Sequence, residues 1–352
     1  MQSEKYSRDN AGQSLKKYIL LKKGELAYNH GASKAKQYGC CYELTEDEAR
    51  IPYVYHCFKV SGTEHTPYVA TALNNPKMDR QLKRLVSSSV RMDGLLNISF
   101  DDYMSVILRL PSLKEQTHIA VFLKKLDERI TAQEKLVESL KKYKRGLISE
   151  ILNQKIRITH EDEKWEEVSL SAVADGFEYG MNAAATIFDG VHKYIRITDI
   201  DDDSHTYIDS APVSPAGVLE GKYRVRENDI LFARTGASVG KSYLYQASDG
   251  DMYFAGFLIR IHVIDGVDSG YVFLNTLTEE YNRWVALEST RSGQPGINAE
   301  QYRRYRFKLP PLETQKQISA IAQKIDAQIK RESQCLRLLQ KQKDGFLQQL
   351  FI

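Results

Sequence analysis

The sequence predicts an α+β protein in which two related domains of mixed α/β structure alternate with two long coiled-coil helices. Two blocks of sequence that occur twice, and one sustained hydrophobic periodicity, predict this arrangement. Residues 110–116, LPSLKEQ, return 199 positions later as LPPLETQ at 309–315, and the match continues without a gap as far as Gly146 and Gly345. The chain therefore contains an internal repeat.

A second block lies nearer the front of each copy and recurs at a spacing of 205 residues. Eight of its 22 positions are identical, among them Gly31 with Gly236. The two copies differ in length, because the second has 57 residues from Trp165 up to Lys222 whereas the first has only 16 before Lys17. We therefore expect the first domain to lack about forty residues at its front.

Each copy ends in a segment that predicts a long helix. Pro111 and Pro310 end the preceding strand, because proline cannot continue a strand ladder but is tolerated in the first turn of a helix. From Ile119, alternating steps of four and three residues meet apolar side chains except at Gln133 and Lys144, which indicates a coiled-coil seam. Roughly 35 helical residues would span on the order of 50 Å. The seam residues we assign are Leu126, Ile130, Val137, Leu140, Lys144, Ile329, Glu332, Leu336, Leu339 and Phe346.

The remaining segments predict mixed α/β domains. Short β-branched or aromatic runs at 194–200, 229–233 and 257–263 predict strands. The glycine-free stretch 272–288 predicts a helix, with 68–86 as its counterpart in the first domain. The expected boundaries are 1–109 for the first domain, 110–158 for the central helix, 159–308 for the second domain and 309–352 for the C-terminal helix.

The composition excludes several classes of protein. With 49 Lys and Arg against 46 Asp and Glu, any basic surface must be a local patch. The four cysteines include no CxxC pair or Cys/His cluster, which disfavours structural zinc and disulfides and favours reduced thiols. No apolar run approaches the roughly 18 residues of a membrane span. We expect a cytoplasmic protein without a metal, cofactor or membrane contact.

The loop after the strand at 229–233 is the first candidate binding element. Gly236 to Ser242 resembles a Walker A motif, but only three residues separate its two glycines instead of four, so we reject nucleotide binding. A tight structural turn is one interpretation. The other is that the glycines let the backbone approach a polyanion, with flanking cations as donors to phosphate or base. The candidate contacts here are Arg234, Thr235, Gly236, Ser238 and Lys241.

A second candidate loop spans 291–298. Gln294 and Asn298 carry the amide that reads adenine, and Arg291 carries the fork that reads guanine, although a plain turn is the alternative. Further candidate DNA contacts are Ser292, Arg196 and, in the first domain, Lys36 and Arg91. His30 and His65 are interpreted as surface residues. We assign no catalytic residue, because Asp209 with Glu220 and Lys222, and Asn75 with Pro76, only superficially match nuclease and methyltransferase motifs.

These motifs carry a family resemblance. Four motifs resemble the specificity subunit of type I restriction-modification systems. They are LPPLETQKQI at 309–318, which opens a long helix ending in GFLQQLF at 345–351, its echo at 110–151, DILFARTG at 229–236 and SGQPGIN at 292–298. The resemblance implies two target recognition domains, each reading one half of a split sequence in double-stranded DNA, separated by two antiparallel coiled-coil helices with pseudo-two-fold symmetry. It further implies docking of two methyltransferase subunits, which restriction motor-nuclease subunits then join, and no catalysis by this chain.

Two alternatives remain open. A protein-interaction adaptor could space two binding domains on the same coiled coil, and strong salt-sensitive binding to duplex DNA would exclude it. An autonomous nuclease or methyltransferase is disfavoured by the missing motifs.

The polar residues of the seam predict a register for the two helices. Placing polar against polar sets Lys144 opposite Glu332 and Gln133 opposite Lys343, which would put Val137 against Leu339. The competing interpretation is that both lysines extend to solvent.

Overall fold

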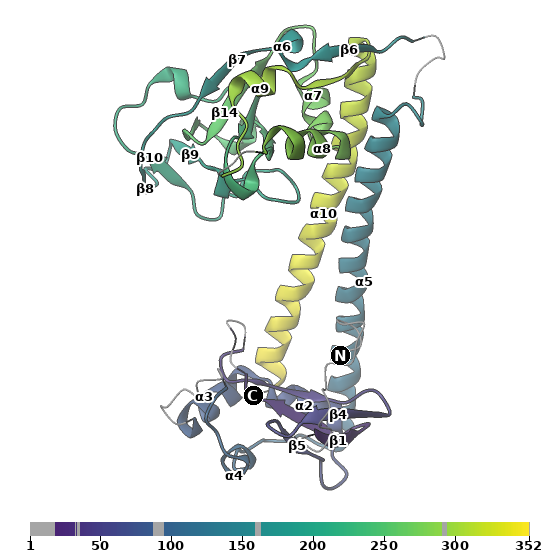
Figure 1. Cartoon of the computed structure of the whole chain (residues 1–352). Coiled ribbons are helices and arrows are strands. Elements are labelled where there is room, and N and C mark those ends of the chain that lie inside the picture. Colours follow the sequence, from purple (N-terminus) through teal and green to yellow (C-terminus); the bar gives the residue numbers. More distant parts are fainter. Residues whose placement is uncertain are drawn as a thin grey trace. The chain divides into compact units, whose positions relative to one another are not determined.

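The computed structural model describes residues 18–31, 33, 36–86, 95–158, 163–290 and 294–351. The chain forms two compact units. Unit 1 comprises Met1–Lys135 with Glu332–Ile352, and unit 2 comprises Leu136–Arg331. Two continuous helices, α5 (Leu113–Leu152) and α10 (Leu312–Leu350), contribute residues to both units (Figure 1). Both helices were predicted from the heptad spacing.

The repeated glutamine of the two motifs makes the same contacts in both copies. In unit 1 the side chain of Gln116 accepts a hydrogen bond from His65 N (3.0 Å) and donates one to Pro111 O (2.9 Å). In unit 2 Gln315 accepts from Asp268 N (2.9 Å) and donates to Pro310 O (2.7 Å). Because both side chains are buried, each glutamine ties the start of its long helix to its domain.

Apolar residues of the two long helices pack into the core of each unit. Leu126, Ile130 and Leu339 are buried together in unit 1, with Leu336 and Phe346 packed against them. In unit 2, Ile148 and Ile151 of α5 and Ile318 of α10 join the main core.

The predicted register of the helices is wrong. Gln133 donates to Glu332 Oε2 (2.7 Å) instead of facing Lys343. Lys144 is paired with Asp326 (2.6 Å) instead of Glu332, and Lys343 is paired with Asp127. The prediction required each lysine to face a polar seam residue, but the long lysine stem lets the ammonium reach a carboxylate beside the seam.

Unit 2 is built on an antiparallel sheet of strand order β12-β11-β14-β7. Its strands are β7 (Ala174–Tyr179), β11 (Asp229–Ala233), β12 (Ser242–Leu244) and β14 (Leu258–Val263). All five residues of β11 are buried, because Ile230 and Phe232 face the core shared with the helices while Leu231 and Ala233 face a second cluster. The strands predicted at 229–233 and 257–263 are confirmed.

Shorter elements surround this sheet. Strand β13 pairs parallel with β9, β10 pairs with β8, and β15 pairs with β6. Their bounds are β6 Glu166–Ser169, β8 Ala185–Ile187, β9 Lys193–Ile195, β10 Val213–Pro215, β13 Met252–Phe254, β15 Arg306–Leu309, and the helices α6 Leu170–Val173, α7 Ser269–Asn275, α8 Glu279–Glu288 and α9 Ala299–Arg303.

Two predicted elements of unit 2 are shorter than expected. The strand predicted at 194–200 ends at Ile195, because the Asp199 carboxylate accepts from Arg196 N (2.9 Å) and closes a 3-10 turn. The helix predicted at 272–288 is two helices, α7 and α8, since the Thr278 hydroxyl caps a new helix by accepting from Tyr281 N (3.2 Å).

The described part of unit 1 contains a three-stranded sheet and the short helices α2, α3 and α4. Strand β2 (Leu26–Asn29) lies between β3 (Cys40–Glu43) and β5 (His56–Phe58), and β1 (Tyr18–Lys22) pairs with β4 (Glu48–Pro52). The helices are α2 (Thr66–Leu73), α3 (Pro76–Leu85) and α4 (Phe100–Met104).

Two expectations for unit 1 are corrected. The helix predicted at 68–86 divides where the Asn75 side chain caps α3. His30 is buried, not on the surface, because both of its ring nitrogens face main-chain carbonyl groups, those of Leu96 and Val54. Within the part of the chain that the structure describes, no helix is long and apolar enough to cross a membrane.

Candidate functional site

The two loops predicted to contact nucleic acid meet in unit 2, directly after β11. Thr235 and Gly296 form an antiparallel bridge. Gly236 N donates to Pro295 O (3.0 Å), and Ile297 N donates to Arg234 O (2.9 Å). The segments 234–241 and 294–298, distant in sequence, therefore form one surface, which we call the paired loops.

Backbone geometry explains the two glycines of the first loop. The chain reverses tightly, since Gly240 N donates to Ala233 O (2.9 Å), and Gly240 has a φ of 88°. A Cβ atom at Gly240 would lie 2.6 Å from Val285, so only glycine fits. Gly236 has a φ of 77°, and a Cβ atom there would lie 3.1 Å from Nε2 of the exposed Gln294. The glycines of the first loop therefore allow its tight turn. The same backbone geometry places the side chain of Gln294 over Gly236.

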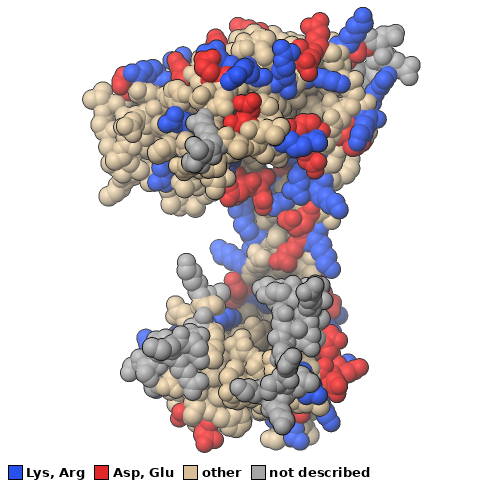
Figure 2. All heavy atoms as spheres, in the orientation of Figure 1, with Lys and Arg blue, Asp and Glu red and all other residues tan. Residues whose placement is uncertain are grey.

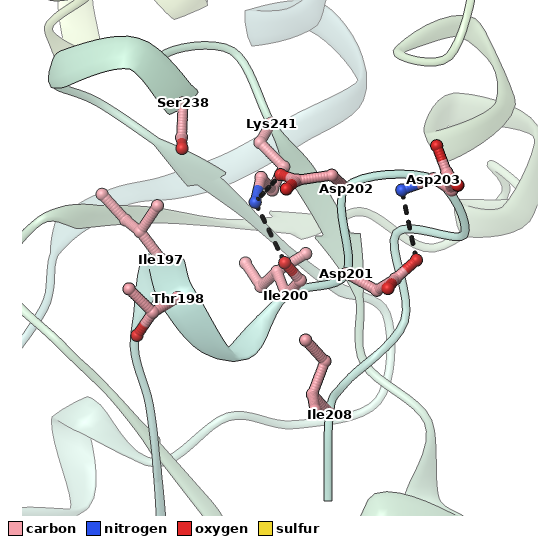
Figure 3. Close-up of a pocket in the computed structure, with 9 residues that line it drawn as sticks. All are labelled: Ile197, Thr198, Ile200, Asp201, Asp202, Asp203, Ile208, Ser238 and Lys241. Carbon is pink, nitrogen blue, oxygen red and sulfur yellow. Dashed lines mark hydrogen bonds and ion pairs between the residues drawn. The ribbon is translucent and has the colours of Figure 1, made fainter. Parts of the chain in front are cut away.

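Lys241, at the end of the first loop, points toward Ile200 and Asp202 beside a hollow of about 500 Å³ (Figure 3). Its ammonium donates to Ile200 O (3.0 Å) and forms an ion pair with Asp202, and only 11% of the side chain is exposed. The positive charge is already neutralised, so contact with a phosphate would require Asp202 to be displaced. The hollow is lined by Ile197, Thr198, Ile200, Asp201, Asp202, Asp203, Ile208, Ser238 and Lys241.

Other predicted contact residues also have partners within the chain. Arg196 makes a bidentate ion pair with Asp199, at 2.8 and 2.7 Å. The exposed Asn298 accepts from Gln301 N (2.8 Å) and thereby caps α9. In unit 1, Lys36 donates to Asn74 O (3.1 Å). The predicted contacts Arg91, Arg291 and Ser292 lie outside the described residues.

Arg234 differs from these residues. Its guanidinium lies over the ring of Tyr179, with 4.8 Å between Cζ and the ring centroid. Among the described residues no carboxylate pairs with it, and its buried Nε has no hydrogen-bond partner. Because no carboxylate of the described residues neutralises its charge, the guanidinium is suited to pair with an acceptor from outside the chain.

Sequence reasoning missed two aromatic residues beside the paired loops. Tyr179 is 43% exposed and Phe257 is 62% exposed. Phe257 is adjacent to the first loop, because its carbonyl accepts from Arg234 N (3.1 Å). A sequence signal was present, since each aromatic has a glycine neighbour next to a strand, Gly180 after β7 and Gly256 before β14.

The charges around the site are mixed. Figure 2 shows Lys and Arg interspersed with Asp and Glu over the visible face of unit 2. At the start of β11, burial raises the pKa of the Asp229 carboxyl above its ordinary value, and the carboxylate contacts His262 Nδ1 (2.8 Å). No group of His, Cys, Asp and Glu in the described ranges is arranged to hold a metal ion.

Comparisons with known proteins agree with this architecture. Residues 162–340 match the family described as type I restriction modification DNA specificity domain. A protein of Methanocaldococcus jannaschii, named as the MjaX specificity subunit of a type I restriction enzyme, is 25% identical over 209 residues. The match covers 56% of this chain and 48% of that relative, so the chain spans about half of its length.

Two solved structures are similar in fold. One is a chain from work on the complex assembly and conformational transition of a type I R-M system, with a TM-score of 0.58, 16% identity, and coverage of 94% of this chain and 82% of that chain. The other is a type I restriction-modification S subunit from M. genitalium, with a TM-score of 0.58, 13% identity, and coverage of 98% and 86%. The predicted fold class is confirmed.

Proposed function

The chain belongs to the family of type I restriction-modification DNA specificity domains, and we propose from this premise that it selects the DNA target of such a system without catalysing a reaction itself. Each unit would read one half of a bipartite double-stranded target. Two methyltransferase subunits would dock on the chain, and restriction motor-nuclease subunits would join through them. In this proposal the two reading domains are those expected from the sequence, residues 1–109 and 159–308, and the helices at 110–158 and 309–352 connect them.

One observation carries the DNA-reading proposal. The paired loops bring Arg234, Gln294 and Asn298 together at the end of a fully buried strand, so their backbone is held by the core. Guanidinium and amide groups are the side-chain groups that recognise base edges in the major groove. Of the amides, that of Gln294 is exposed, whereas that of Asn298 also caps a helix.

Mapping methylated bases in a host genome tests the proposal. Cells with the gene should carry a bipartite methylated motif that is absent when the gene is deleted and returns when it is restored. In the same strain, Gln294→Ala should change the bases required in one half of the motif while the other half stays. An unchanged methylome after deletion would contradict the proposal.

The salt dependence of duplex binding distinguishes a DNA-reading protein from the adaptor alternative. A chain that neutralises phosphates loses duplex affinity steeply as salt rises, with a slope of about 0.9 per phosphate contact. Titration of fluorescent duplexes with the full chain, together with its methyltransferase partners, should show this slope. Binding that is absent, or that does not respond to salt, would favour the adaptor.

A further inference from the structure

Arg234 and Tyr179 come from strands that are separated within the sheet. Tyr179 is the last residue of β7, Arg234 follows β11, and β14 lies between these two strands. Their side chains nevertheless stack, with 4.8 Å between the guanidinium carbon and the ring centroid. Such a stack is favourable by about 0.5 to 2 kcal/mol and fixes the plane of the guanidinium.

The ring of Tyr179 is held at both ends. Its main chain is paired in the sheet opposite Ile259, and its hydroxyl oxygen accepts from Ala299 N (3.2 Å) at the start of α9. The next residue, Gly180, approaches the carbonyl of Ala255 so closely that a Cβ atom would lie 2.2 Å from that oxygen. The tyrosine is thus a rigid platform.

The main chain of Arg234 is held equally firmly. Its N–H donates to Phe257 O (3.1 Å) and its carbonyl accepts from Ile297 N (2.9 Å). Two arginines of the same unit have carboxylate partners, Arg224 with Asp251 and Arg260 with Glu178. Among the described residues Arg234 has no such carboxylate, and its Nε lacks an acceptor.

We propose that Tyr179 is a positioning residue that orients the guanidinium of Arg234 to read a guanine, an inference that rests on the DNA-reading function proposed above. Bidentate recognition of guanine O6 and N7 requires both the fork and a defined plane, whereas a phosphate requires mainly charge. A guanidinium already held on an aromatic ring loses less conformational freedom on binding, which favours base recognition.

Selection from a pool of randomised duplexes by the full chain with its methyltransferase partners tests this role. Arg234→Lys retains the charge and removes the fork, so preference for guanine at one position should fall roughly 5- to 150-fold. Tyr179→Leu removes the ring and should lower preference at that same position by roughly two- to thirtyfold. Tyr179→Phe retains the ring and should preserve most of the preference.

The controls separate three outcomes. Arg224→Lys, in which the arginine is tied to Asp251, should leave every base preference unchanged. Circular dichroism and thermal unfolding show whether Tyr179→Leu is folded. A folded Tyr179→Leu that keeps the full guanine preference, or a Tyr179→Phe that loses it, would overturn the positioning role of the ring. Equal loss of affinity for all duplexes in Arg234→Lys would assign the side chain to a phosphate and overturn the proposal. Absence of any sequence preference in the unmodified chain would instead contradict the DNA-reading function itself.

Discussion

Gln133 of α5 donates a hydrogen bond to Glu332 of α10, at 2.7 Å between Nε2 and Oε2, and these two residues occupy the same position of the internal repeat. A residue contacts its own repeat equivalent where two antiparallel copies of one helix cross. The ion pair of Lys144 with Asp326 in unit 2 likewise has its repeat equivalent in unit 1, where Lys343 pairs with Asp127. The repeated sequence therefore encodes its own helix register through polar contacts.

Disulfide crosslinking checks this register. In a Cys335→Ser background, which removes the native thiol beside the seam, Gln133→Cys with Glu332→Cys should oxidise readily to a disulfide. Val137→Cys with Leu339→Cys, the pair favoured by the sequence-derived register, should crosslink poorly. Mobility on a non-reducing gel reports both. Efficient crosslinking of Val137→Cys with Leu339→Cys, and none of Gln133→Cys with Glu332→Cys, would contradict the observed register and support the one predicted from the sequence.

Substitution of Gly240 should destabilise unit 2. Gly240→Ala places a methyl group against Val285 in a backbone conformation that only glycine adopts easily, which should lower the free energy of unfolding by about 2 to 4 kcal/mol. Gly266→Ala is a matched control, because its φ of 87° is nearly the same but a Cβ atom there has open space. Urea unfolding should show the smaller loss, about 1 to 2 kcal/mol, for Gly266→Ala. Equal losses would show that Val285 yields without cost.

Acidic pH should lower the folding stability of unit 2, because His205 takes up a proton more readily in the unfolded chain. Burial lowers the pKa of this imidazole, and Lys241 and Lys144 act in the same direction, while the Ser242 carbonyl and Asp201 oppose them. The unfolded chain, with a histidine pKa of about 6.5, takes up the proton first, so stability contributed by neutral His205 is lost as pH falls below about 6.5. Since His205 has a φ of 54°, His205→Asn retains the conformation and should reduce the fall in thermal midpoint between neutral and mildly acidic pH. Identical pH profiles for the two proteins would rule out this role.

Release of Lys241 should strengthen DNA binding without changing specificity. Asp202→Asn removes the carboxylate that neutralises the ammonium, so affinity for every duplex should rise several-fold and the salt slope should increase by about one contact. Asp209→Asn is the matched control, because it frees Lys193 from a similar ion pair of 2.7 Å elsewhere in unit 2. Duplex titrations at several salt concentrations compare the two variants. An equal rise in duplex affinity for Asp202→Asn and Asp209→Asn would indicate a general effect of net charge and would contradict a phosphate contact at Lys241.

The sequence predicted those features that depend on local pattern. The internal repeat and the apolar spacing at Leu126 and Ile130 can be read from one stretch of sequence. The same holds for the loop glycines, because a tight turn favours glycine wherever φ is positive. The pairing of Lys144 with Asp326 did not follow, because a long flexible side chain can choose among several carboxylates. Tyr179 was missed for a different reason, since its stack with Arg234 depends on the order of strands in the sheet.

The most direct measurement compares the duplexes selected by the unmodified chain with those selected by an Arg234→Ala, Gln294→Ala double variant, both in complex with methyltransferase partners. If the paired loops read DNA, the variant should lose roughly tenfold or more in preference at the positions of one half-site and retain the other half-site. Retention of the full bipartite motif by a folded double variant would contradict recognition by these loops.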